Sequence, residues 1–135
     1  FTRVRLGGLL HLAGARMSKS RGNVVSPDEY AHLAPDVLRL ALLFTMPWEH
    51  TGQFRDDQIA GADRFVARVR RWFADGVDGT ESAGPAIERV THAMENLKFN
   101  VAIATLMEWR GRIDRATFVR LLWPLAPTVA DSLIL

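Results

Sequence analysis

The sequence predicts a mainly α-helical fold in which a short β-hairpin, carrying a basic loop, precedes an antiparallel α-helical bundle. Three observations predict this class. Apolar residues recur at helical spacing through most of residues 35–133, whereas the alternation typical of a strand occurs only near the start. Short loops separate the third to sixth helical segments, which favours antiparallel packing. The apolar fraction of 48% is ample for one core in a chain of 135 residues.

The hairpin is predicted over residues 3–17. Apolar and polar residues alternate over residues 3–6, an apolar run follows at residues 9–12, and Ala13-Gly14 is a plausible turn. Because an isolated hairpin is only marginally stable in water, we expect it to pack on the helices or to belong to a larger sheet.

The first helix is predicted to begin at Ser26, whose hydroxyl can cap it. Pro27 suits the first helical position, and Glu29 completes a capping box. A second helix is expected over residues 35–46. It is apolar nearly all round, which is typical of a buried helix, and Pro47 ends it.

The polar loop over residues 48–55 is the best internal boundary, and it divides the chain into residues 1–50 and residues 51–135. A third helix is predicted over residues 57–74, where an acidic pair marks its start. A flexible, glycine-rich connection over residues 75–85 follows it.

Four more helical segments complete the predicted bundle. The fourth follows the apolar positions of residues 87–97, Asn100 is expected to cap the fifth, and Asp114 is expected to cap the sixth. Pro127 is expected to open a short last helix that runs through Leu133.

Positive charge is concentrated at the N-terminal end of the chain. The formal net charge is only +2, but residues 1–27 contain no acidic residue and five basic ones, namely Arg3, Arg5, Arg16, Lys19 and Arg21. This asymmetry favours an anionic partner, either a nucleotide or an RNA backbone.

Composition also excludes several classes of site. The chain has no cysteine, which excludes disulfides and cysteine-ligated metals and fits a cytoplasmic location. The four histidines show neither metal-ligand nor triad spacing, so we expect no protein-bound metal and no catalytic histidine. No apolar run approaches the length that spans a bilayer, so we expect no membrane partner.

The loop at residues 16–23 has the chemistry needed to hold a polyphosphate. Lys19 supplies a compact ammonium, and Arg16 supplies a planar fork of donors that matches phosphate oxygens. Two serines add hydroxyls, and Gly22 with Asn23 permits a turn. On residue types alone, a solvated basic turn before a helix is an equally good interpretation.

Residues 16–29 read Arg-Met-Ser-Lys-Ser-Arg-Gly-Asn-Val-Val-Ser-Pro-Asp-Glu. This string resembles the KMSKS loop of class I aminoacyl-tRNA synthetases and the helix that follows it. The chain is similar to leucyl-tRNA synthetases in particular, with landmarks in the expected order at residues 36–40, 61–69, 97–104 and 124–127. The resemblance therefore covers nearly the whole chain.

The resemblance implies part of an enzyme, a leucine–tRNA ligase that forms an aminoacyl-adenylate from ATP and contacts tRNA. Residues 1–50 would carry the loop of the catalytic body, and residues 51–135 would form an anticodon-binding-like helical bundle. The ATP phosphates would be bound by Arg16, Met17, Ser18, Lys19 and Ser20, with Mg²⁺ entering on ATP. Lys19 would be catalytic, because it stabilises charge on the leaving pyrophosphate. Arg16 stands where the family has a lysine, and Met17 is expected to anchor the loop.

The family's other ATP-binding element, His-Ile-Gly-His, does not occur in this sequence. It would lie with the amino-acid pocket in an upstream nucleotide-binding half, in the same or a separate chain, so we expect the isolated chain to be inactive. Residues 128–132 also depart from the family's pattern of a histidine, two glutamates and a tryptophan. The alternative is a free-standing tRNA- or protein-binding module with a vestigial loop, but an intact lysine in the loop favours the enzyme.

Arg64, Arg68 and Arg71 recur at positions i, i+4 and i+7 of the third helix. Such a stripe could follow a tRNA backbone, or it could be an ordinary solvated face, and both interpretations stay open. The four tryptophans could stack on bases, but packing in or beside the core is the better expectation.

Overall fold

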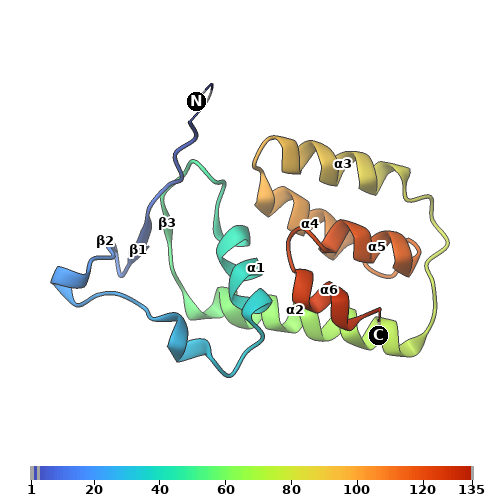
Figure 1. Cartoon of the computed structure of the whole chain (residues 1–135), viewed down its shortest axis with the longest axis horizontal. Helices are drawn as coiled ribbons and strands as arrows, with labels where there is room; N and C mark the ends of the chain where they lie inside the picture. Colours follow the sequence, from blue (N-terminus) through green and yellow to red (C-terminus); the bar gives the residue numbers. More distant parts are fainter. Residues whose placement is uncertain (1, 3, 135) are drawn as a thin grey trace.

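The computed structural model describes residue 2 and residues 4–134, so the predictions for Arg3 lie outside the described residues. A small three-stranded sheet lies beside a group of α-helices (Figure 1). The fold is mainly α-helical with an N-terminal hairpin, which confirms the predicted class. Within the described part of the chain, no helix is both long and apolar enough to cross a membrane.

The hairpin consists of β1 (Leu10–Leu12) and β2 (Ala15–Arg16), which pair antiparallel. Ala13 and Gly14 join the strands with positive φ angles of 50° and 79°. Two-residue hairpin turns need this conformation because its twist matches that of the strands. The predicted hairpin and turn are confirmed, but the strands occupy only part of the expected residues 3–17.

A third strand, β3 (Gly52–Gln53), lies in the segment predicted as a loop and pairs parallel with β1. Next to it, the N–H of Phe54 donates to the carbonyl of His11 at 2.8 Å. The absence of a side chain at Gly8 lets this residue lie against the backbone of His50, because a Cβ at Gly8 would lie 1.7 Å from the carbonyl oxygen of His50. Two residues are too few to show alternation, so the sequence pattern could not reveal this strand.

Two short 3-10 helices, η1 (Lys19–Arg21) and η2 (Pro27–Tyr30), connect the hairpin to the first α-helix. The predicted capping interactions are present: Ser26 Oγ accepts a hydrogen bond from the N–H of Asp28 at 3.3 Å, and Glu29 Oε1 accepts one from the N–H of Ser26 at 2.8 Å. The expected helix nevertheless ends after a single turn. Ala34 has an extended ψ of 136°, as residues before a proline prefer, and this excludes a continuous helix into the next element.

Helix α1 (Pro35–Thr45) agrees with the helix predicted over residues 35–46. The expectation that it is buried all round is wrong. Only one side of the helix is buried, and on the other side Leu38, Leu42 and Leu43 are only partly buried. The reason is that α1 packs against α2 and α4 on one side, while its opposite side lines open grooves.

The other helices follow the predicted order, namely α2 (Asp56–Asp75), α3 (Gly84–Glu95), α4 (Phe99–Trp109), α5 (Arg115–Leu122) and α6 (Pro127–Ser132). Asp114 caps α5 as predicted, because its Oδ1 accepts a hydrogen bond from the N–H of Thr117 at 2.8 Å. The predicted cap at Asn100 is wrong. Leu97 takes a φ of 54° in a tight turn after α3, and α4 therefore begins before Asn100.

The connection between α2 and α3 is tied to the start of α5 by two ion pairs. Arg115 donates to Asp78 Oδ1 from its backbone N–H at 2.8 Å and from Nε at 3.0 Å. Two guanidinium nitrogens of Arg112 each lie 2.8 Å from a carboxylate oxygen of Glu81. These hydrogen bonds hold the pKa of both carboxyl groups below their ordinary values.

One hydrophobic core runs through α1 and the bundle. Helix α4 packs against α3 and α1, and α1 also packs against α2 (Figure 1). The predicted division between residues 50 and 51 stays a prediction, although the core and the β1–β3 pairing join the two segments.

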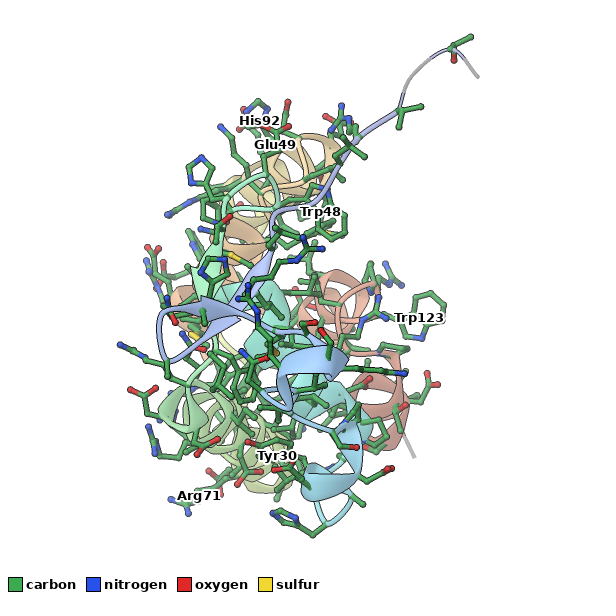
Figure 2. All side chains as sticks on the ribbon, turned by 90° about the vertical axis from the view of Figure 1, so that its left-hand side faces the viewer. Tyr30, Trp48, Glu49, Arg71, His92 and Trp123 are labelled. Carbon is green, nitrogen blue, oxygen red and sulfur yellow. The ribbon has the colours of Figure 1, made fainter. Side chains whose placement is uncertain are left out.

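Only two of the four tryptophans pack as predicted. Trp72 is 8% exposed and Trp109 is half-buried, whereas Trp48 and Trp123 are 40% and 53% exposed. Figure 2 shows Trp123 projecting at the edge of the molecule. The ring of Trp48 packs against the ring of Phe99, and Trp123 donates a hydrogen bond from Nε1 to the carboxylate of Asp131 on α6.

Candidate phosphate-binding loop and arginine groove

The basic loop begins where β2 ends and is wound into η1. The N–H of Arg21 donates to the carbonyl of Ser18 at 3.0 Å, and the N–H of Gly22 donates to the carbonyl of Lys19 at 3.1 Å. Gly22 closes the turn with a φ of 66°, a conformation that glycine adopts without strain. The predicted turn is confirmed.

Asn23 holds the two ends of this loop together. Its Oδ1 accepts a hydrogen bond from the N–H of Ser18 at 2.9 Å, and its Nδ2 donates to the carbonyl of Arg16 at 3.1 Å. Both bonds reach the backbone and leave the side chains of the basic residues free. The sequence suggested only that Asn23 permits a turn, so this bridging role was missed.

Met17 is half-buried and packs against the hydrophobic core. It lines an apolar cavity of about 110 Å³ together with residues of the hairpin and α1, among them Leu10 and Leu42. The prediction that Met17 anchors the loop is confirmed. Because Met17 packs on the core while Lys19 and Ser20 stay exposed, the polar part of the loop faces solvent.

The cationic side chains of the loop are exposed. Arg16, Lys19 and Arg21 all face solvent, and among the described residues none of them forms an ion pair. Ser18 Oγ and Ser20 Oγ lie 2.8 Å apart and can both turn toward a ligand. Three uncompensated charges and two hydroxyls on one short loop can bind a polyphosphate.

The described residues contain no group of three His, Asp or Glu side chains that could hold a metal ion. The loop itself carries no carboxylate.

The predicted arginine stripe lies on the exposed side of α2. Arg64 and Arg68 line a groove of about 380 Å³ between α2 and the pair formed by α1 and α4. Arg71 lies one turn further along, and Figure 2 shows it pointing away from the body of the protein. The structure thus brings two of the three arginines into one groove and leaves the third outside it.

Two polar residues of α1 have contacts that the sequence did not reveal. Asp36 is 4% exposed and accepts a hydrogen bond from the N–H of Val129, in α6. One turn later, Arg39 Nε donates to the carbonyl of Leu125 at 3.0 Å. The only sequence signal was the presence of charged residues in an otherwise apolar helix.

The fold places an exposed basic loop at the end of a hairpin, beside a group of α-helices. The model of the family described as tRNA synthetases class I (M) matches residues 1–69, the segment that carries this loop. Because these 69 residues are half of the 135-residue chain, the chain belongs to the class I tRNA synthetases.

Curated relatives are leucine–tRNA ligases. The protein from Rubrobacter xylanophilus is 35% identical over 94% of this chain and 18% of the relative. The protein from Deinococcus radiodurans is 31% identical over 98% of this chain and 20% of the relative. The chain therefore spans about a fifth of the length of these relatives.

A solved structure shares the fold. It is the LeuRS in the ternary complex LeuRS–tRNA–LeuAMS of Agrobacterium radiobacter K84 agnB2, which matches with a TM-score of 0.78 at 24% identity. The match covers 95% of this chain and 21% of that chain.

Proposed function

We propose that this chain is part of a leucine–tRNA ligase and that it supplies the loop that binds the phosphates of ATP. The observation that carries the proposal is the loop of residues 16–23, in which three exposed cations form no ion pair with any of the described residues. The similarity of the chain to leucine–tRNA ligases supports leucine as the amino-acid substrate. In the reaction, the carboxylate of leucine attacks the α-phosphorus of ATP, and pyrophosphate leaves.

In this reaction Lys19 stabilises the negative charge that grows on the departing pyrophosphate. Its ammonium is exposed at the first position of η1, where it can follow the leaving group. Arg16, Ser18 and Ser20 bind the β- and γ-phosphates, and Met17 holds the loop to the core. Mg²⁺, when bound, neutralises part of the phosphate charge and is carried by ATP rather than by protein carboxylates.

The helical bundle contributes to tRNA binding in this proposal. Arg64, Arg68 and Arg71 are exposed along α2, and none of them forms an ion pair within the described part of the chain. Guanidinium groups placed in this way contact phosphates and give salt-dependent affinity. The amino-acid pocket and the remaining ATP contacts belong to an upstream nucleotide-binding half, and the complete enzyme works in the cytoplasm.

The proposed role of the loop is tested by measuring ATP–pyrophosphate exchange in the complete enzyme, in which this chain is joined to the upstream nucleotide-binding half. Leucine, isoleucine, valine and methionine are supplied separately, and we expect exchange with leucine. Lys19→Ala is expected to lower the leucine-dependent rate about 100-fold, as loss of one transition-state donor does.

The chain offers a matched control, because Lys98 is its only other lysine and is also exposed. Lys98→Ala is expected to leave the exchange rate unchanged. An equal rate for the unaltered enzyme and Lys19→Ala would contradict the role of the loop, and exchange with another amino acid would contradict the assignment of leucine.

A further inference from the structure

Three polar side chains form a row across the small sheet. The strands lie in the order β2, β1, β3. Arg16 of β2 is paired with His11 of β1, and His11 is also paired with Gln53 of β3. Residues that lie opposite each other in neighbouring strands point to the same face of a sheet. The three side chains therefore share one face, with His11 in the middle.

This row lies on the face of the sheet that is turned away from the core. Along a strand, successive side chains point to opposite faces. Leu12 packs against the core, and Leu10 lines the apolar cavity together with Met17. Both neighbours of His11 in β1 thus face inward, so the imidazole of His11 faces outward beside Arg16.

His11 and Arg16 form a closely spaced cross-strand pair. The N–H of Met17 donates to the carbonyl of Leu10 at 3.3 Å, and this hydrogen bond belongs to the next pair along the hairpin. Because hydrogen-bonded and non-hydrogen-bonded pairs alternate in an antiparallel ladder, His11 and Arg16 form a non-hydrogen-bonded pair. The Cβ atoms of such a pair are about 5 Å apart. The imidazole is therefore within reach of an anion that the Arg16 guanidinium binds.

The ring of His11 has no polar partner within the described part of the chain. It is half-buried, and neither of its nitrogens forms a hydrogen bond or an ion pair with a described residue. Gln53, by contrast, accepts a hydrogen bond from the N–H of Gly14 at 3.2 Å. An imidazole carries at least one N–H donor in either protonation state, and the acid-free residues 1–27 offer it no carboxylate.

We propose that His11 is a further phosphate-binding residue, which donates a hydrogen bond to the same phosphate group of ATP as Arg16. Imidazole N–H and guanidinium groups both donate to phosphate oxygens. The loop begins where β2 ends, so the row on the sheet continues the basic surface of the loop. This inference rests on the proposed ATP-binding function and extends its phosphate contacts from the loop to the central strand of the sheet.

The test measures ATP–pyrophosphate exchange in the complete enzyme, with the concentrations of ATP, pyrophosphate and leucine varied in turn. His11→Ala is expected to raise the KM for ATP and the KM for pyrophosphate about tenfold, because each loses one hydrogen bond to a charged group. The KM for leucine should stay the same. His11→Gln keeps an N–H donor and should restore most of the affinity for both phosphate substrates.

His92→Ala is the matched control, because His92 is exposed on α3, away from the hairpin (Figures 1 and 2). We expect its three KM values to equal those of the unaltered enzyme. An unchanged KM for ATP in His11→Ala would overturn the proposal. So would an equal rise in the KM for leucine, or a His11→Gln variant that is as impaired as His11→Ala.

The double variant His11→Ala plus Arg16→Ala tests whether the two residues share one phosphate group. Residues that contact the same group are coupled, so the KM for ATP should rise by less than the product of the two single effects. A rise equal to that product would overturn the shared contact.

Lys19→Ala separates this proposal from the function on which it rests. If Lys19→Ala slows exchange while His11→Ala has no effect, the assignment of His11 is wrong and the proposed function of the loop stands. If Lys19→Ala has no effect, the proposed function fails and the assignment of His11 fails with it.

Discussion

The carboxylate of Asp36, in the first turn of α1, accepts a hydrogen bond at 2.8 Å from the backbone N–H of Val129, in the first turn of α6. The N–H groups of a first helical turn have no partner within their own helix. Asp36 of α1 therefore caps the N-terminus of α6. Because Asp36 is only 4% exposed, water cannot easily replace its carboxylate as the acceptor for this N–H.

We predict that Asp36→Ala destabilises the protein by about 2 kcal/mol, since it removes a cap and leaves a buried N–H without a partner. The loss is measured as the change in the free energy of unfolding by urea denaturation. Asp36→Asn keeps an acceptor oxygen in the same place, so its loss is expected to be smaller.

Asp63→Ala is the control for this experiment, because Asp63 lies on the exposed surface of α2. A surface substitution of this kind is expected to stay within about 0.5 kcal/mol of the unaltered chain. Similar values for Asp36→Ala and Asp63→Ala would show that the contact between α1 and α6 contributes nothing measurable.

The bridge made by Asn23 leads to a prediction about catalysis rather than folding. Asn23→Ala removes two hydrogen bonds that hold the loop ends, at 2.9 Å to the N–H of Ser18 and at 3.1 Å to the carbonyl of Arg16. Because the loop is exposed, the free energy of unfolding should change little. In the complete ligase, we expect a higher KM for ATP and a slower ATP–pyrophosphate exchange, since the cations are no longer preorganised.

Asn96→Ala provides the comparison, because Asn96 is exposed at the end of α3 and, among the described residues, its side chain bonds only the carbonyl of His92. It should leave both kinetic constants unchanged. A KM for ATP that is the same in Asn23→Ala and the unaltered enzyme would remove the support for preorganisation of the loop.

These contacts show which parts of the molecule the sequence could predict. Ser26 and Asp114 are caps that bond a backbone N–H two or three residues away, so their position in the sequence is enough to identify them. The hairpin turn at residues 13–14 is similarly local. The helical spacing of apolar residues also located all the main helices, because burial of one face imposes that period.

Two of the missed features, β3 and the contact of Asp36, depend on residues distant in sequence. Next to β3, Gly8 fits against the backbone of His50 and Gly52 fits against the side chain of Met46, and the period of two residues cannot be read from so short a strand. Asp36 accepts a hydrogen bond from the N–H of Val129, which lies 93 positions later in the sequence. The loop was recognisable from residue chemistry and from a family resemblance, but the bridge by Asn23 required knowledge of how the loop closes.

The last prediction concerns Tyr30, the only tyrosine in the chain. Its hydroxyl donates a hydrogen bond to Asp56 Oδ1 and thereby joins η2 to the start of α2. The hydrogen bond to Asp56, together with partial burial and the nearby negative charge, raises the pKa of Tyr30 to about 12. The pKa of a tyrosine in an unfolded chain is about 10.

The direction of the pH effect follows from this difference. A raised pKa in the folded state means that the neutral phenol is favoured by folding, so the stabilisation is complete below pH 10 and is lost as the pH rises from about 10 to about 12. Because no other tyrosine is present, absorbance at the phenolate band reports this one group. We expect a midpoint near pH 12, and a midpoint shifted toward 10 in Asp56→Asn.

Far-UV circular dichroism has to be recorded through the same titration, because an unfolded chain also titrates near pH 10. A midpoint near 10 while the helical signal is intact would refute the contact between Tyr30 and Asp56. If the contact is real, Asp56→Asn should also reduce the loss of stability between pH 10 and pH 12, since the pKa of Tyr30 in the folded variant then lies closer to that of the unfolded chain.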